Sequence, residues 1–228
     1  MAAEKYKVKR FVFISSLAAT GPLKTADGRI KENKEHNPVT AYGKSKLSAE
    51  RKLEKINIPV TILRPTAIYG PREKDIFLVN QYLNKGFEPY IGRAPQKLSF
   101  VYGKDVADLA VKALRYLNSN GAYNISDGNE YSRYEYATIV KTLLGKKTVK
   151  LHLPVIIVKA LLFAVEKFSR SMNKVPAVSN EKLNELMAEN WICDITKAQD
   201  ELGFAPSYNL EKGLKESIEW YKKNNWLK

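Results

Sequence analysis

A tyrosine and a lysine four residues apart, Tyr42 and Lys46, are the residues of this sequence best suited to acid–base chemistry. On a helix, positions i and i+4 lie on one face, so the phenol and the ammonium are neighbours. A free phenol has a pKa of about 10, which is too high for a base near neutral pH. An ammonium about 5 Å away, at an effective dielectric constant of about 20, favours the phenolate by roughly 3 kcal/mol, or about two pKa units. The pair therefore predicts a general acid/base.

Two further segments support the same site. Ser15 and Ser16 close an apolar run at residues 10–15, and the sequence RPTAIYGP follows a second apolar run at residues 59–63. Both runs are typical of strands that are buried on both faces of a parallel sheet. Side chains at the carboxyl ends of such strands point into the ligand crevice. We therefore expect these segments and the tyrosine–lysine pair to serve one site.

The order of the elements predicts a doubly wound α/β fold. Thr40 is a suitable N-cap for the helix that begins near Ala41 and contains the tyrosine–lysine pair. An amphipathic helix at residues 104–117, with Leu109 and Leu114 among the apolar residues of its inner side, precedes a third strand at residues 122–126. Alternation of strands and helices implies a parallel sheet with helices on both faces.

Beyond residue 127 the sequence changes to helices with short extended pieces between them. Ser132 and Glu135 form a capping-box pattern for a helix that ends at Gly145, and residues 209–225 form a final amphipathic helix. The apolar residues 153–168 are too few and too interrupted to span a bilayer. We expect them to form a helix buried between two lobes, with a helix at a membrane interface as the alternative.

Composition excludes several classes of protein. The 228 residues include one cysteine, Cys193, which rules out a disulfide framework and a multi-cysteine metal cluster and favours a reducing, cytoplasmic setting. The net charge of +14 comes largely from 29 lysines that are spread along the chain. Because no arginine-rich block or nucleic-acid motif accompanies them, we expect a solvated basic surface and no nucleic-acid partner. The first ten residues are not a secretory signal.

The ordered segments FVFISS, AYGKSK, RPTAIYGP, SFVYGKDVA and ELGFAP resemble the extended short-chain dehydrogenase/reductases, which include NAD-dependent epimerases and dehydratases. The resemblance covers essentially the whole chain. It implies that Tyr42 is the catalytic acid/base and that Lys46 binds the nicotinamide ribose while assisting the tyrosine. It implies that Ser16 orients the substrate, whereas Ser15 is expected to cap the following turn. Pro65, Thr66 and Ile68 correspond to the segment that contacts the nicotinamide side of NAD or NADP.

The implied reaction is hydride transfer between a secondary alcohol or its ketone and the nicotinamide, so the protein would be an oxidoreductase or isomerase acting on a small molecule. Many nucleotide-sugar members have an arginine where this chain has Leu98, and Arg93 and Lys97 are the candidates to replace it. A nucleotide sugar is slightly favoured as substrate. The alternatives are an apolar alcohol, as in the 3β-hydroxysteroid dehydrogenase and dihydroflavonol reductase branches, and a non-catalytic binding or scaffold protein.

The family's opening strand, glycine-rich turn and helix have no counterpart in this sequence. We therefore expect an incomplete Rossmann-like sheet that lacks its N-terminal strands, in a chain that is inactive alone. Residues 1–70 and 99–126 would be the remnant of the dinucleotide-binding domain, and residues 71–98 and 127–228 a mostly helical substrate lobe. The strand at residues 10–15 would then be an exposed edge through which the chain self-associates.

Overall fold

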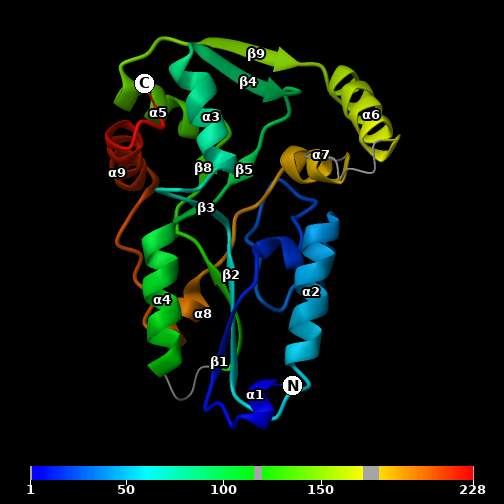
Figure 1. Ribbon diagram of the computed structural model, residues 1–228, viewed down its shortest axis with the longest axis vertical. Helices are drawn as coiled ribbons and strands as arrows, with labels where there is room; N and C mark the ends of the chain where they lie inside the picture. The colour runs from blue at the N-terminus through cyan, green and yellow to red at the C-terminus, as the bar shows by residue number, and fades with distance from the viewer. Residues whose placement is uncertain (1, 116–119, 172–179, 228) are drawn as a thin grey trace.

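A three-stranded parallel sheet forms the centre of the lower part of the molecule in the computed structural model, which describes residues 2–115, 120–171 and 180–227 (Figure 1). The strand order is β1 (Phe11–Ile14), β2 (Val60–Pro65) and β7 (Gly121–Ile125). Phe11 lies opposite Val60 in the register. These are the three strands expected from the sequence, and β1 is an edge of this sheet.

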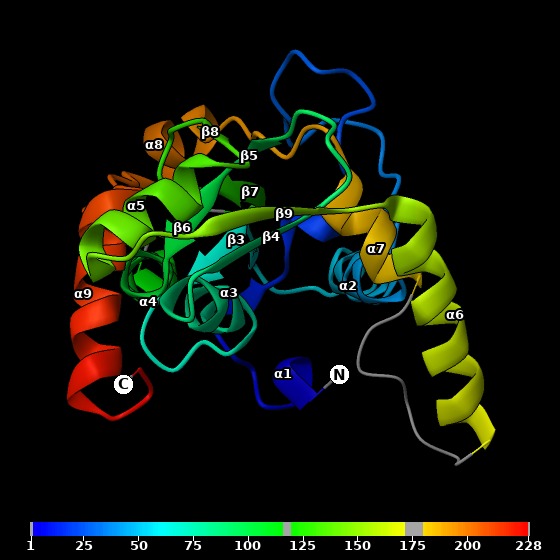
Figure 2. The same ribbon diagram turned by 90° about the horizontal axis from the view of Figure 1, so that it is seen from above.

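Helices cover both faces of the sheet. α2 (Ala41–Leu53) lies on one side and α4 (Gly103–Arg115) on the other, as the two ribbon views agree (Figures 1 and 2). Side chains alternate across a strand, so Phe11 and Phe13 pack in the cluster that includes Leu53 of α2. Val12 and Ile14, the other two residues of β1, pack against the cluster on the α4 side. The predicted doubly wound parallel fold is confirmed.

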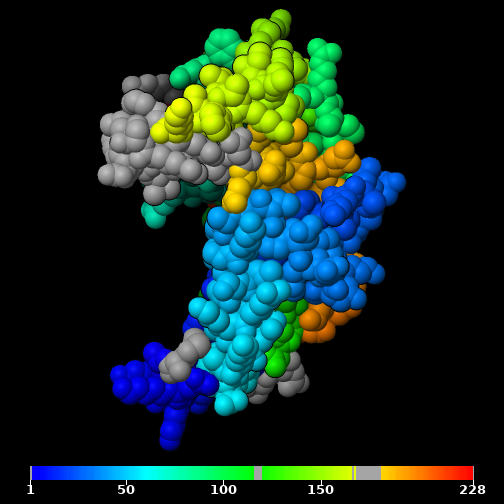
Figure 3. Space-filling view, turned by 90° about the vertical axis from the view of Figure 1, so that its right-hand side faces the viewer, coloured from blue at the N-terminus to red at the C-terminus, as the bar shows by residue number. Residues whose placement is uncertain are grey.

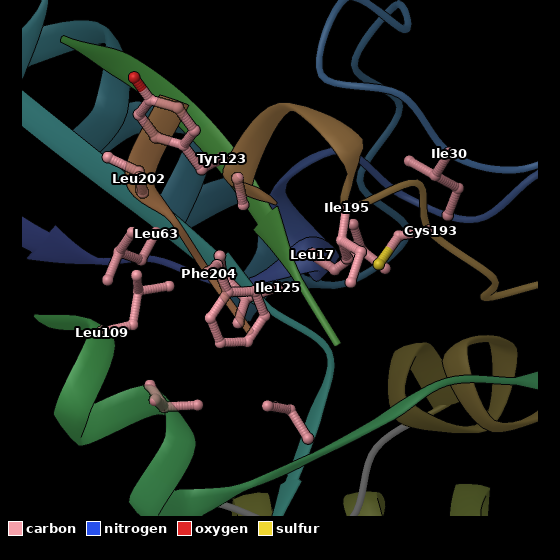
Figure 4. Packing of buried hydrophobic residues seen from close by; sticks show 13 residues of the cluster. Leu17, Ile30, Leu63, Leu109, Tyr123, Ile125, Cys193, Ile195, Leu202 and Phe204 are labelled. Carbon is pink, nitrogen blue, oxygen red and sulfur yellow. The ribbon is translucent and has the colours of Figure 1, made fainter. Parts of the chain in front are cut away.

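The larger core fills the α4 side of the sheet, where Leu63, Tyr123 and Ile125 meet Leu109 of α4 (Figure 4). α8 (Thr196–Leu202) adds Leu202 to this cluster. Each fully buried aliphatic side chain contributes about 1.5–3 kcal/mol. Part of the region that the predicted boundaries assign to the substrate lobe thus packs on the sheet.

The rest of the chain forms a second group of elements, richer in strands than the sequence led us to expect. Within the described residues of this group there are three two-stranded sheets: β3 (Ala67–Tyr69) with β6 (Phe100–Tyr102), β4 (Phe87–Ile91) with β9 (Val149–Leu153), and β5 (Lys97–Leu98) with β8 (Tyr131–Ser132). The helices are α3 (Asp75–Asn84), α5 (Glu135–Leu144) and α9 (Leu210–Lys223). As predicted, α5 ends at Gly145, whose φ of 64° is the left-handed conformation that glycine adopts without strain.

The apolar segment after β9 forms α6 (Val155–Ser171), which contacts α7 (Asn180–Met187). The expectation of a helix buried between the lobes is wrong for this segment, since Ile156, Leu161 and Phe163 are 78%, 62% and 65% exposed. Among the α6 side chains that the structure describes, the narrow stripe formed by Val155, Val158 and Leu162 is partly covered. Residues spaced by three or four form one stripe of a helix, so Ile156, Leu161 and Phe163 lie outside that stripe and face outward.

Two short helices complete the N-terminal part. α1 (Ala2–Lys5) precedes β1, and η1 (Leu17–Ala19) is a short 3₁₀ turn that follows β1. Along α4 the sequence placed Leu114 on the inner side, but that side chain is exposed. The predicted end of α4 at residue 117 lies outside the described residues.

Candidate active site

The tyrosine–lysine pair lies in the first two turns of α2. Thr40 is the N-cap, as predicted: its Oγ1 accepts a hydrogen bond of 3.0 Å from the Gly43 N–H. Lys46 Nζ donates to the Ile14 carbonyl oxygen at 3.0 Å and lies 5.7 Å from the centroid of the Tyr42 ring. Tyr42 itself is 52% exposed. The ammonium is therefore held between the phenol and the carboxyl end of β1, while the phenol stays open to a reactant.

Gly43, between these two residues, allows α2 to approach the backbone of η1. A Cβ atom at this position would lie 2.4 Å from the Ala18 carbonyl oxygen, a distance that no side chain tolerates. Glycine is used where backbones approach closely. The contact brings the first turn of α2 against the turn that follows the two serines.

The two serines at the end of β1 differ in what their side chains contact. Ser16, not Ser15, caps the following turn: its Oγ accepts from the Ala18 N–H at 3.2 Å. Ser15 is buried, and its hydroxyl donates to Oε1 of Glu50. The expectation that Ser15 caps the turn is therefore wrong, because its side chain points inward toward α2.

Glu50 and Arg64 form a buried ion pair beneath the site, and sequence analysis missed both. Arg64 Nη2 lies 2.7 Å from Glu50 Oε2, and Arg64 Nε donates to both carboxylate oxygens at 3.1 and 3.2 Å. The two side chains are 3% and 1% exposed. Together with the hydroxyl of Ser15, this pair joins α2 to the carboxyl ends of β1 and β2. The signal was present: Glu50 follows Lys46 by four residues on the same helix face, and a strand arginine between apolar residues needs a partner.

His36 and the backbone of the preceding loop complete the surroundings of Arg64. Arg64 Nη2 lies 3.0 Å from His36 Nε2, and Nη1 donates to the Glu32 carbonyl oxygen at 3.4 Å. Burial and the neighbouring guanidinium lower the pKa of His36. A neutral imidazole accepts the arginine hydrogen bond, so the loop is attached to the buried pair.

The segment expected to contact the nicotinamide begins where β2 ends. Pro65 is its last residue, and the Thr66 N–H donates to the Ile125 carbonyl oxygen at 2.9 Å. Thr66 Oγ1 is buried and has no hydrogen-bond partner within the described part of the chain. Ile68 lies in β3 and packs against the larger core. An unsatisfied hydroxyl at this strand end fits a ligand that offers a hydrogen-bonding group, as a nicotinamide does.

The two basic residues expected to bind substrate lie between β4 and the end of β5. Arg93 is exposed, and Lys97 Nζ lies 3.0 Å from Asp27 Oδ1. The buried Arg133 donates to the carbonyl oxygens of Ile91 and Ala94 on either side of Arg93, at 3.0 and 2.6 Å. Arg133, which sequence analysis did not single out, therefore fixes the backbone that positions Arg93. Over residues 2–115, 120–171 and 180–227, histidine, cysteine, aspartate and glutamate side chains form no group of three that could bind a metal.

Comparison with known proteins gives relatives along nearly the whole chain. UDP-glucose 4-epimerase of Vibrio cholerae is 28% identical over 225 residues, covering 96% of this chain and 65% of the relative. N-acetyl-alpha-D-glucosaminyl-diphospho-ditrans,octacis-undecaprenol 4-epimerase of Escherichia coli O157:H7 is 27% identical, covering 96% of this chain and 67% of the relative. The chain thus spans about two thirds of the length of these relatives.

A solved structure shows the same fold. The UDP-glucuronic acid 4-epimerase of Bacillus cereus, in complex with UDP-glucuronic acid and NAD, aligns with a TM-score of 0.74 at 25% identity, covering 98% of this chain and 64% of that one. The sequence model of the NAD dependent epimerase/dehydratase family matches residues 1–126, more than half of the chain and the part that contains the tyrosine–lysine pair. The chain belongs to the NAD dependent epimerase/dehydratase family.

Proposed function

We propose that this protein is the catalytic and substrate-binding part of a nucleotide-sugar epimerase or dehydratase. The observation that carries the proposal is the position of the Lys46 ammonium, between the Ile14 carbonyl oxygen and the ring of an exposed Tyr42. This is the arrangement that a phenol needs to exchange a proton with a substrate hydroxyl. The named relatives act on sugars linked to diphosphates, which supports the same class of substrate here.

Each residue of the site has a separate task in this proposal. Tyr42 takes the proton from a secondary hydroxyl and returns it to the ketone. Lys46 holds its ammonium beside the Tyr42 ring and binds the ribose next to the nicotinamide, and Ser16 orients the substrate hydroxyl. Pro65, Thr66 and Ile68 form the wall on the nicotinamide side. When bound, the dinucleotide supplies hydride transfer at the nicotinamide ring.

The nucleotide sugar is favoured over the apolar alcohol for a structural reason. An apolar substrate would need an enclosed apolar wall, and the segment that could have provided it, α6, exposes Ile156, Leu161 and Phe163. The loop fixed by Arg133 instead presents the guanidinium of Arg93, whose planar fork suits phosphate oxygens. Lys97 can assist once it leaves Asp27, an exposed partner that holds it weakly.

We infer that the 228-residue chain alone binds dinucleotide negligibly, because the pyrophosphate cradle that the family places at a glycine-rich turn is not among its motifs. We also infer that it self-associates through β1, whose outer edge has no strand paired to it in the described structure. Calorimetric titration with NAD and light scattering test both statements. A monodisperse monomer with micromolar affinity for NAD would contradict them.

The proposed function is tested by joining a glycine-rich strand–turn–helix unit from a family member ahead of β1. The extended protein is incubated with NAD and, in parallel, with UDP-glucose, UDP-glucuronic acid, dTDP-glucose and an apolar secondary alcohol. We expect epimer or keto-sugar to form from at least one nucleotide sugar, as followed by nuclear magnetic resonance. Oxidation of the apolar alcohol alone would support the alternative substrate, and dinucleotide binding without any turnover would support the non-catalytic alternative.

A further inference from the structure

The two-stranded sheet of β4 and β9 has one apolar face that is open to solvent. Side chains alternate across a strand, and in β9 the residues Val149, Leu151 and Leu153 are all exposed, Val149 by 63%. Phe87 of β4, which lies opposite Val149 in the register, is also exposed. On the other face of β4, the side chains of Glu88 and Tyr90 are buried. The apolar face therefore points away from the core.

α6 continues this surface without a break in the chain, because β9 ends at Leu153 and α6 begins at Val155. The ribbon of β9, which runs beside β4, leads directly into α6, and α6 extends along one side of the molecule (Figures 1 and 2). In the space-filling view the yellow-green surface of this region lies above the blue and cyan surface that includes α2 (Figure 3). The exposed large apolar side chains of the helix are Ile156, Ile157, Leu161, Phe163 and Val165.

The charged residues of the same region are predominantly basic. Between Lys146 and Arg170 the sequence has six lysines and arginines and a single acidic residue, Glu166. On α6, the exposed Lys159 lies at the border between the partly covered stripe and the outward apolar residues, and the exposed Lys167 lies among those apolar residues. Exposed apolar residues with lysines beside and among them suit a helix that lies in the plane of a bilayer interface.

We propose that β9 and α6 form a docking surface for a bilayer that contains anionic lipids, which we call the β9–α6 surface. Its apolar side chains enter the boundary between headgroups and acyl chains, and its lysines contact lipid phosphates. None of the helices in the described residues is long and apolar enough to cross a membrane, so the contact is a peripheral one. The occupant is lipid and not a second copy of the chain, because a symmetric dimer would bring two equally basic surfaces together.

The experiment is flotation of the 228-residue chain with vesicles, which separates bound protein from aggregates. Vesicles of phosphatidylcholine alone are compared with vesicles that also contain phosphatidylglycerol. We expect roughly tenfold more protein to float with the anionic vesicles, and this excess to disappear at high salt. Leu161→Asp should lower the floating fraction at least tenfold. The double substitution Lys159→Gln and Lys167→Gln should remove the preference for anionic vesicles.

Matched substitutions on α4 are the controls. Leu114→Asp changes a leucine of comparable exposure, 53%, on another helix, and the double substitution Lys112→Gln and Arg115→Gln removes two exposed charges there. Both should float like the parent, and circular dichroism should give all variants the same unfolding midpoint. Equal flotation of Leu161→Asp and Leu114→Asp would overturn the proposal. So would light scattering that shows an oligomer dissolved by Leu161→Asp while no variant floats, since a second copy would then cover the surface.

Discussion

The ionisable side chains at the two ends of α2 differ in their exposure and in their hydrogen bonding. In the first turn, Tyr42 is 52% exposed and its neighbour Lys46 makes one hydrogen bond, to a backbone carbonyl. Two turns later, Glu50 is 1% exposed and accepts hydrogen bonds from Arg64 and Ser15. One end of the helix is accessible and the other is fully paired.

This difference shows that the residues that fix the position of α2 are separate from those that carry its proposed reactivity. A buried ion pair gives little net stability, since desolvation offsets the attraction, but its loss leaves an uncompensated charge. Glu50 and Arg64 therefore fix where α2 lies on the sheet. The location of the side chains at the helix start follows from that position. Substitutions at the buried end should change stability, and substitutions at the exposed end should change turnover.

The largest expected effect is at the buried end. Glu50→Gln removes the charge that compensates Arg64 and should lower the free energy of unfolding by about 3–5 kcal/mol. Glu54→Gln, which changes an exposed carboxylate at the C-cap of the same helix, is the control and should change it by less than about 0.5 kcal/mol. Denaturant unfolding followed by circular dichroism gives both values. Equal effects of the two substitutions would mean that the buried pair does not fix the helix.

The next effect belongs to the exposed end. In the extended protein that tests the proposed function, Tyr42→Phe should lower turnover at least about a hundredfold, because the ring remains and only the proton exchange is lost. Its unfolding free energy and its affinity for dinucleotide should stay close to the parent values. Turnover within threefold of the parent would remove Tyr42 from the mechanism.

Lys46→Met sharpens the comparison, because Lys46 lies between the two ends. The substitution keeps the apolar stem and removes the ammonium that donates to the Ile14 carbonyl oxygen. The substitution also removes the proposed hydrogen bond to the ribose. A hydrogen bond from a charged group contributes about 1.5–3 kcal/mol, so dinucleotide affinity and turnover should each fall about tenfold or more. Titration calorimetry and steady-state rates measure the two quantities separately. An unchanged dissociation constant would contradict the proposed ribose contact.

The smallest effect is a pH dependence at the buried end. The pKa of His36 is lowered in the folded chain by burial and by Arg64, from about 6.5 in an unfolded chain. The unfolded state therefore binds the proton more readily, and stability that is present above about pH 6.5 is lost as the pH falls toward the folded-state pKa. His36→Gln should flatten the unfolding midpoint between neutral and mildly acidic pH relative to the parent. Parallel curves for the two proteins would show that His36 does not titrate against Arg64.

The sequence predicted the parts of this site that depend on local signals. Thr40 precedes a helical pattern and caps it, and the spacing of Tyr42 and Lys46 alone places them on one face. The ion pair was missed because Glu50 and Arg64 lie on different elements, and the local signal at each residue does not show which partner it has. The roles assigned to Ser16, Tyr42 and Lys46 stay predictions.

Long-range pairing explains the other differences. Local patterns in the sequence do not predict β4 or β9 as a strand. Their parallel pairing joins segments about sixty residues apart. That pairing, together with the narrow packed stripe of α6, decides that an apolar helix faces outward. Hydrophobicity alone could not distinguish a helix between lobes from a helix on the surface.

The contact between Gly43 and the Ala18 carbonyl oxygen also bears on how this family could diversify. Because the Ala18 carbonyl lies against Gly43 there, any side chain at position 43 would push the start of α2 away from the turn after the serines. In the loop between η1 and Thr40, the buried Ile30 and the arginine-bonded His36 are likewise constrained, whereas exposed positions such as Asn33 and Glu35 are not. Those exposed positions can change one at a time while Tyr42 keeps its place.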